Sequence, residues 1–310
     1  MTCDLEYQTN FINKYGIVEI CDARPSVLTS DTTEINEEDY ANIKTGDLVY
    51  VITTALPMWF QHIYPRLVRD KISIFLVTGD AVSSAPLAVF SSGPAGLDSL
   101  FDAGVIRHWF AQNCDIMGHP KVTPIPLGID FHTRHNRVLE GEALQSPDLQ
   151  DQQLTALTAE QRSSEAWYRK RPELFVDIQY SLAPNPLDRS EALLAAGSLR
   201  ATFKTEERLT RQSYWELMRE FRFVLSPLGK GVDCHRTWEA LALGAVPIIK
   251  RTAISSLFDG LPVWQVGAYT EINDERLAAF AYPVDISPEA IARLTLKFWQ
   301  DVIQRTRSGH

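Results

Sequence analysis

The segment Phe221–Lys250 constrains the fold of this chain more than any other. Its sequence, FRFVLSPLGKGVDCHRTWEALALGAVPIIK, predicts a buried strand, a polar loop with two glycines, an amphipathic helix and a second buried strand. Two strands joined through a helix are typical of a parallel sheet with crossover connections. The segment therefore indicates an α/β fold with a ligand-binding loop at the start of a helix.

Strands and helices alternate in the same way in both halves of the chain. In the first half, strands are expected at Asp47–Thr53 and Lys71–Thr78, and an extended segment at Val122–Ile129. Helical spacing marks Trp59–Val68, which contains Pro65, and Leu97–Asp102. The alternation indicates a first parallel sheet.

The pattern restarts after residue 171. Further elements are expected as strands at Leu174–Ser181 and Pro262–Val266 and helices at Asp188–Ala196, Gln212–Glu220 and Cys234–Leu243. Ser287 and Pro288 predict the start of a last helix that runs to about Arg305. Two successive α/β halves predict a ligand in the cleft between them, at the carboxyl ends of the strands.

The length of the chain agrees with two domains. A chain of 310 residues is too long for a single hydrophobic core and suits two units of about 150 residues each. We expect the domains to span residues 1–170 and 171–310. The polar stretch Leu149–Arg162 predicts a surface helix before the connection between them. An insertion within one domain explains the same stretch, and the sequence leaves both interpretations open.

Composition limits the partners and the compartment. The net charge of -9 disfavours a nucleic-acid partner, and the mixed-charge run Lys204–Arg211 is interpreted as a solvated helix face. The four cysteines lie far apart without zinc spacing, which favours free thiols in a reducing compartment. The sequence contains neither a signal-peptide pattern nor an apolar run long enough to span a membrane, so we expect a soluble, cytoplasmic chain.

The loop and helix of the opening segment carry the residue types of an anion site. Gly229 and Gly231 permit unusual backbone angles and close approach of a ligand, and Lys230 and Arg236 supply charge suited to a pyrophosphate. Asp233 is either the N-cap of the helix or a direct ligand.

Two side chains of the helix itself extend the pattern. His235 and Glu239 are four residues apart and share one helix face. A glutamate within an apolar stretch is costly to bury without a partner, which favours a functional role for Glu239.

Other phosphate motifs fit this segment poorly. A P-loop needs a Ser or Thr after its lysine, where this chain has Gly231, and the dinucleotide fingerprint needs a third glycine, where it has Cys234. The sequence contains no D-x-D triplet, so it offers no visible ligand set for metal-held diphosphate chemistry.

The run SPLGKGVDCHRTWEALALGAVPIIK resembles the nucleotide-sugar-binding segment of exostosin-like glycosyltransferases, which are grouped around glycosyltransferase family 47. The blocks LVYVITTALPMWFQHIYPRL, FLVTGD, IRHWFAQNCD and KVTPIPLGIDFHT in the first half resemble the same group more loosely. The resemblance implies a GT-B architecture, in which two Rossmann-like domains face each other across a cleft. The first domain would bind the acceptor, and the second, with a final helix, the donor.

The resemblance also implies the chemistry. It predicts an inverting, metal-independent transfer of a hexosyl or pentosyl group from a nucleotide sugar, expected to be a UDP-sugar, to a glycan or another hydroxyl acceptor, without a cofactor. Glu239 would bind the ribose. The residues expected around the diphosphate are Ser226, Gly229, Lys230, Gly231, His235 and Arg236.

Inversion requires a base from across the cleft. Asp80, which follows the second strand, is the first candidate, although a turn-capping role explains it equally well; Asp130 and His132 are the second. The residues expected on the acceptor side are Arg107, His108, Trp109 and Asn113, and Trp109 is either a sugar-stacking platform or a core residue.

Two further functional classes remain open at this stage. A binding module of the same fold would hold a nucleotide or a glycan without turnover. A nucleotide-sugar epimerase or dehydrogenase is weakened by the missing dinucleotide fingerprint. The chain can also be the soluble catalytic portion of a larger, Golgi-type enzyme.

Overall fold

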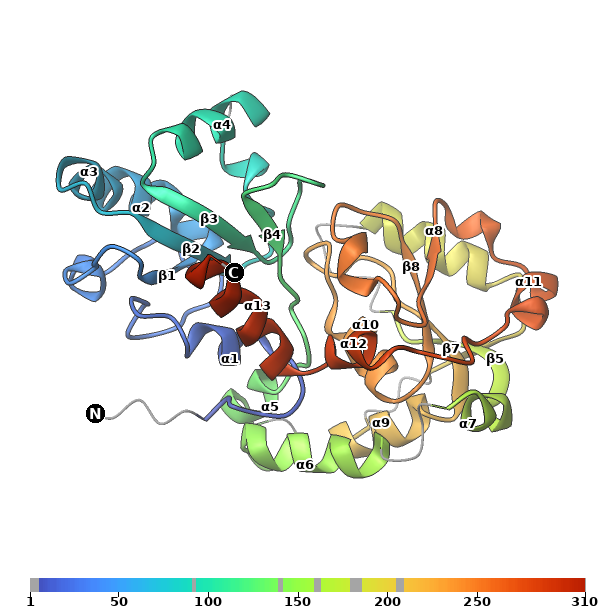
Figure 1. Ribbon diagram of the computed structural model, residues 1–310. Helices are drawn as coiled ribbons and strands as arrows, with labels where there is room; N and C mark the ends of the chain where they lie inside the picture. The colour runs from blue at the N-terminus through green and yellow to red at the C-terminus, as the bar shows by residue number, and fades with distance from the viewer. Residues whose placement is uncertain are drawn as a thin grey trace.

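The structure is a computed structural model that describes residues 6–90, 93–138, 142–158, 163–178, 186–204 and 209–309. Two parallel sheets, one in each half of the chain, form its framework (Figure 1). The first has the strand order β1-β2-β3-β4 and the second the order β6-β5-β7-β8-β9. Both have helical connections, as the alternating sequence pattern predicts.

The first sheet contains β1 (Leu48–Ile52), β2 (Ile74–Gly79), β3 (Ile106–Ala111) and β4 (Val122–Pro124). Every residue of β1 and β2 is buried, as expected for parallel strands that are covered on both faces. The connecting helices are α2 (Leu56–His62), α3 (Tyr64–Arg69) and α4 (Pro94–Asp102). The helix expected over Trp59–Val68 is thus divided, because Pro65 begins a new helix in α3.

The second sheet contains β5 (Arg171–Val176), β6 (Ala201–Phe203), β7 (Phe221–Leu225), β8 (Val246–Lys250) and β9 (Trp264–Val266). Its helices are α8 (Pro186–Ala196), α9 (Arg211–Met218), α10 (His235–Ala242) and α11 (Asp274–Ala279). The β7–α10–β8 unit is the crossover predicted from the opening segment. Gly244, with φ +69°, follows α10 in the left-handed conformation that favours glycine. The last residues expected in the strand Leu174–Ser181 lie outside the described residues.

Three helices connect the two sheets: α5 (His132–Asn136), α6 (Pro147–Thr158) and α7 (Ser164–Arg169). The surface helix predicted at Leu149–Arg162 corresponds to α6, whose last predicted residues, 159–162, lie outside the described residues. It is more than a surface helix, because Gln150 and Leu154 are fully buried and α6 packs against α9. Asp151 of α6 also accepts hydrogen bonds from the backbone N–H groups of Asn10 and Phe11, each 3.0 Å long.

The C-terminal segment differs from the single helix expected from Ser287 to Arg305. Ser287 caps α12 (Pro288–Ala292) as predicted, but Thr295 caps a separate helix, α13 (Leu296–Ser308). The chain bends between them because Leu296 N–H donates to the carbonyl of Asn10, 3.0 Å away. As a result α13 lies beside α1 (Lys14–Val18), next to the first sheet (Figure 1).

Short 3-10 turns complete the described secondary structure, at Glu37–Tyr40, Thr53–Ala55, Leu87–Val89, Ser255–Phe258 and Tyr269–Glu271. Among the described helices, none combines the length and the apolar character that a membrane crossing requires. Cys21, Cys114 and Cys234 are free thiols, and Cys3 lies outside the described residues. The predicted α/β class, with two parallel-sheet units and a pocket between them, is confirmed.

Candidate functional site

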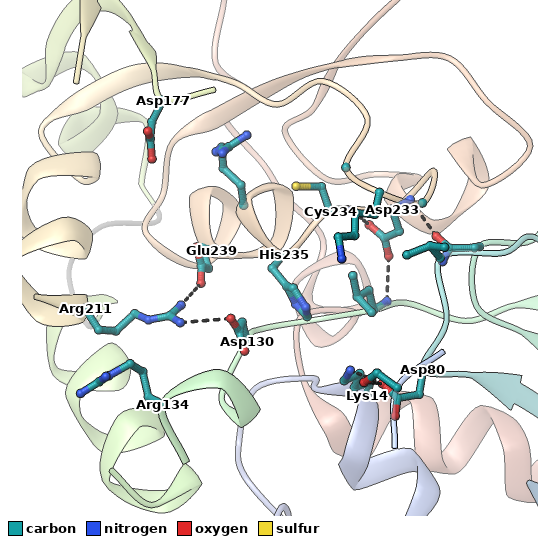
Figure 2. Close-up of a pocket in the computed structure, with 18 of the residues that line it drawn as sticks. Lys14, Asp80, Asp130, Arg134, Asp177, Arg211, Asp233, Cys234, His235 and Glu239 are labelled. Carbon is teal, nitrogen blue, oxygen red and sulfur yellow. Dashed lines mark hydrogen bonds and ion pairs between the residues drawn. The ribbon is translucent and has the colours of Figure 1, made fainter. Parts of the chain in front are cut away.

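A pocket of about 580 Å³ lies between the two halves of the chain (Figure 2). Its lining includes residues that directly follow strands, such as Asp80 after β2 and Asp177 after β5, together with the loop between β7 and α10. We call the lining residues up to Glu142 the first wall and those from Asp177 onward the second wall. The pocket therefore occupies the carboxyl edge of the sheets, as predicted.

The two walls differ in charge. Among the described residues, the second wall carries the cations Arg189, Lys204, Arg211, Lys230 and Arg236 and the carboxylates Asp177, Asp233 and Glu239. The first wall carries the cations Lys14 and Arg134 and the carboxylates Asp31, Asp80, Asp130 and Glu142. An anion is therefore favoured at the second wall, in a protein whose net charge is negative.

The glycines of the loop act through space rather than through unusual backbone angles. Neither Gly229 nor Gly231 has a positive φ, so the expectation of special angles is wrong. A Cβ on Gly231 would lie 2.5 Å from the side chain of Asn113 in the first wall. Gly231 thus allows close approach of the opposite wall, and both glycines line the pocket.

Asp233 links the two walls. It does not cap α10, whose N-cap is Cys234, so that interpretation is wrong. Its carboxylate accepts from Leu127 N–H at 2.7 Å and from the Trp238 indole at 2.9 Å. Its own N–H donates to Asn113 Oδ1 at 3.0 Å. Burial raises the pKa of Asp233 to about 6.

The first turn of α10 is available to an anion, because the N-cap residue makes no side-chain hydrogen bond to it. Arg236, in that turn, lines the pocket, and its Nε has no hydrogen-bond partner among the described residues. Burial lowers the pKa of Arg236, but neighbouring Tyr214, Cys234 and Asp177 outweigh it and hold the pKa above its usual value. Arg236 therefore stays charged and has donor capacity for a ligand.

His235 is held as a neutral imidazole. Its Nδ1 lies 2.6 Å from the carbonyl oxygen of Gly128, which can only accept, so Nδ1 carries the proton. Burial lowers its pKa to about 4. The remaining nitrogen, Nε2, is then an acceptor, which suits a hydroxyl better than a phosphate oxygen.

Glu239 is buried and paired. Its Oε1 accepts from Arg211 Nη1 at 2.7 Å, and Arg211 Nη2 donates to Asp130 Oδ2 at 3.1 Å (Figure 2). Burial raises the pKa of Glu239, and the guanidinium of Arg211 opposes that rise. The ion pair with Arg211 offsets the free-energy cost of burying Glu239, a cost that the sequence indicated.

Ser226 does not line this pocket. It is buried, and its Oγ lies 2.8 Å from Thr237 Oγ1, a contact that ties β7 to α10 beneath the loop. Ser226, which was predicted to contact the diphosphate, therefore has a structural role.

On the first wall, Asp80 lies in the pocket but is fully engaged. Its Oδ1 forms an ion pair with Lys14 and accepts from Ser30 Oγ at 2.7 Å, and its Oδ2 accepts from the Tyr15 hydroxyl at 3.3 Å. Asp80 also adopts a positive φ of 52°. It serves neither as a helix cap nor as a simple turn residue, because tertiary contacts hold both oxygens.

Asp130 and His132 form an acid–imidazole pair, because Asp130 Oδ1 lies 2.9 Å from His132 Nδ1. Burial raises the pKa of Asp130, but the His132 hydrogen bond and the electrostatic influence of the neighbouring His132, His235 and Arg211 outweigh it and hold the pKa well below its usual range. His132 is not among the residues that line the pocket. Its ring centre nevertheless lies 5.4 Å from that of His235, which lines the pocket.

Asp130, His132 and His235 are also the described residues that best suit a metal ion, since one ligand atom from each lies within 4.8 Å of the others. Their other contacts fit a metal poorly. The Arg211 guanidinium lies 3.1 Å from Asp130 Oδ2, and the Nδ1 atoms of both histidines are already engaged with oxygens. A divalent ion would have to displace a full positive charge.

Of the four residues expected on the acceptor side, the structure brings only Asn113 to the pocket. The other three lie earlier on β3, away from its carboxyl end. Arg107 is exposed over the Phe75 ring, and His108 lies 2.8 Å from Thr123 Oγ1. Trp109 is a core residue whose indole donates to Thr78 Oγ1 at 2.9 Å.

Sequence reasoning missed Lys14, Arg189, Lys204 and Arg211, all of which line the pocket. Lys204 and Arg211 bound the run that was interpreted as a solvated helix face, and residues 205–208 lie outside the described residues. Thr210, the N-cap of α9, is a visible signal that places Arg211 at a helix start. Nothing local marks Lys14, because its partner Asp80 is 66 residues away.

A family model described as the RXYLT1 C-terminal domain matches residues 190–258, less than a quarter of the chain. The match includes the loop and α10, but it does not test the exostosin-like assignment specifically. No curated protein sequence matches this chain.

Solved structures with a similar backbone belong to other proteins. The N-terminal domain of the Candida albicans trehalose-6-phosphate phosphatase has 12% identity and a TM-score of 0.41, over 88% of this chain and 72% of that one. The UDP-forming α,α-trehalose-phosphate synthase of Burkholderia xenovorans has 9% identity and a TM-score of 0.40, over 89% of this chain and 79% of that one. At such scores the likeness carries no argument about the function of this chain. Within the described residues, the candidate site is defined by its own geometry and by the match to the RXYLT1 C-terminal domain over residues 190–258.

Proposed function

We propose that this chain is a glycosyltransferase that moves a sugar from a nucleotide donor, with UDP-sugars as the first class to test, to a hydroxyl acceptor. The observation that carries the proposal is the second wall. It places several cations and an uncapped helix start beside a buried glutamate. That combination suits a diphosphate next to a ribose. The family model matches residues 190–258, so the match also supports a site in the second half of the chain.

In the proposed reaction, the acceptor oxygen attacks the anomeric carbon of the donor sugar. The bond from that carbon to the phosphate oxygen breaks, and the nucleoside diphosphate leaves with the electron pair. Arg236 and Lys230, together with the N–H groups of α10, would stabilise the charge that develops on it. Glu239 would accept hydrogen bonds from the ribose hydroxyls.

The acceptor hydroxyl must lose its proton to a base. We favour the Asp130–His132 pair over Asp80. Both oxygens of Asp80 are engaged by Lys14, Ser30 and Tyr15, whereas Asp130 orients His132 through Nδ1 and leaves Nε2 to take the proton. An in-line attack opposite the leaving group inverts the anomeric centre, and we propose that no metal ion takes part.

A panel of UDP- and GDP-sugars tests the proposal by hydrolysis and by transfer to simple glycans. We expect turnover with at least one donor. Asp130→Asn should then lower kcat at least 100-fold, in the range typical of general base loss, with only a few-fold loss of donor affinity. If Asp80→Asn abolishes turnover while Asp130→Asn does not, the base belongs to Asp80.

A binding module of the same fold is the second candidate. It is favoured because both oxygens of Asp80, the first candidate for the base, are already engaged. Under this alternative a UDP-sugar binds, yet neither hydrolysis nor transfer occurs with any acceptor in the panel. Measured turnover that Asp130→Asn removes excludes it.

A further inference from the structure

One guanidinium joins the two walls of the pocket. Arg211 donates through Nη1 to Glu239 Oε1 at 2.7 Å and through Nη2 to Asp130 Oδ2 at 3.1 Å (Figure 2). Glu239 belongs to α10 in the second wall, and Asp130 lies between β4 and α5 in the first. The three side chains are 13%, 5% and 15% exposed for Arg211, Glu239 and Asp130, so water screens the contacts weakly.

We propose that Arg211 is a positioning residue that couples donor binding on the second wall to the Asp130–His132 pair on the first. This inference rests on the proposed function and adds a residue to it. Neither the loop motif nor the residues expected on the acceptor side include Arg211. Its role is to hold two carboxylates in fixed orientations through the two arms of one planar group.

At the donor end, Arg211 determines what Glu239 offers to a ligand. It occupies Oε1 and so directs the carboxylate, leaving Oε2 as the acceptor for a ribose hydroxyl. A buried carboxyl without a cation tends to take up a proton, and a protonated Glu239 would lose part of its acceptor capacity. Arg211 therefore opposes protonation of Glu239 and fixes the orientation of its carboxylate.

At the acceptor end, Arg211 binds one of the two carboxylate oxygens of Asp130 and leaves the other to different partners. The guanidinium takes Oδ2, while Oδ1 receives Thr133 N–H at 2.9 Å and faces His132 Nδ1 at 2.9 Å. The orientation of the imidazole thus depends on a carboxylate that is fixed from both sides. Loss of Arg211 would free Asp130 to rotate and would leave His132 less well oriented.

The position of Arg211 is itself fixed by both halves of the chain. Thr210 caps α9 through a 3.1 Å hydrogen bond from Ser213 N–H, and the Arg211 N–H donates to Glu142 Oε1 of the first wall at 3.0 Å. The guanidinium also lies 5.5 Å from the centre of the buried Trp215 ring. A bridge anchored in this way transmits a change at one carboxylate to the other.

A double-mutant cycle tests the coupling without turnover. The dissociation constant of UDP is measured by calorimetry for the intact chain, Arg211→Gln, Asp130→Asn and the double variant. We expect Arg211→Gln to weaken UDP binding about tenfold, by loss of an oriented, charged partner. Asp130→Asn should weaken it about threefold in the native background, because Arg211 is then held at one end only. In the Arg211→Gln background it should have no effect.

Two further variants separate positioning from folding. Arg211→Lys keeps the charge but loses the two-armed geometry, so it should restore part of the UDP affinity and little of kcat. Arg276→Gln, on exposed α11 of the same half, is the matched control and should change neither quantity.

Three outcomes overturn the inference. An Asp130→Asn effect that is equal in both backgrounds shows that Asp130 acts without Arg211. Full recovery of kcat in Arg211→Lys shows that charge alone suffices. Absence of UDP binding to the intact chain overturns the proposed donor and the coupling with it, and this result is distinct because it precedes any variant.

Discussion

The two walls of the pocket are built in the same way but offer different chemistry. Each presents residues at the carboxyl edge of a parallel sheet. The second wall has an excess of cations and an uncapped helix start, whereas the first has an excess of carboxylates, with Asp80 and Asp130 each tied to a cation. The fold alone therefore does not indicate which wall binds the donor; the charge on each edge does.

The largest effect is expected from Arg236→Ala in the second wall. Its guanidinium lines the pocket and its buried Nε has no partner among the described residues, so its loss should lower kcat/KM by about 100- to 1,000-fold, as for removal of a donor to a developing negative charge. Steady-state kinetics with the best donor of the panel measures this. A loss below fivefold would remove Arg236 from the leaving-group site and weaken the contrast between the walls.

Asp233, which joins the walls, should make stability depend on pH. Burial raises its pKa to about 6, whereas an unfolded aspartate titrates near 3.9. The folded state thus holds a proton that the unfolded state releases, so the contribution is fully present below about pH 4 and is lost as the pH rises through about 6.

Urea unfolding of the intact chain and of Asp233→Asn at about pH 4 and about pH 7 isolates this contribution, because other groups cancel in the difference. The free energy of unfolding of the intact chain should fall relative to the variant by up to about 3 kcal/mol over that range. A difference that is constant or that changes in the opposite direction contradicts the assignment.

Gly231→Ala should force the two walls apart where Gly231 meets Asn113. The added Cβ would lie 2.5 Å from the Asn113 side chain and should cost about 1–3 kcal/mol of stability. Asn113→Gly keeps the positive φ at that position accessible, and combining the two changes should recover part of the loss. Denaturant titrations measure both; without recovery in the double variant, the strain does not arise from Asn113.

The smallest effect is expected from Arg107→Ala, a residue that the sequence placed on the acceptor side. Its side chain is exposed over Phe75 and away from the pocket, so kcat/KM for donor and acceptor should change less than twofold and stability by at most about 1 kcal/mol. An acceptor KM that rises tenfold would return Arg107 to the acceptor surface and extend the first wall along β3.

The second wall was easier to predict from the sequence than the first. The β7–α10–β8 unit concentrates Lys230, His235, Arg236 and Glu239 within ten residues, so local pattern sufficed to bring them together. The first wall is assembled from distant segments. Lys14 meets Asp80 and Asp130 meets Arg211 only through tertiary packing, across separations of 66 and 81 residues.

The incorrect site predictions have tertiary causes that no local pattern records. Trp109 and His108 have the residue types of a glycan surface, but the register of β3 places them before the carboxyl edge. Asp233 has the position of a helix cap, yet its carboxylate accepts from Leu127 N–H of the other half and its own N–H donates to Asn113 Oδ1. In both cases an interaction outside the local sequence decided the outcome.

Calorimetric titration with UDP shows whether the second wall holds the nucleotide diphosphate. We predict binding by the intact chain with a dissociation constant between about 1 μM and 1 mM, weakened at least tenfold in Glu239→Ala and unchanged within twofold in Asp80→Asn. Equal losses in the two variants, or the loss only in Asp80→Asn, would place the nucleotide on the first wall and contradict the account.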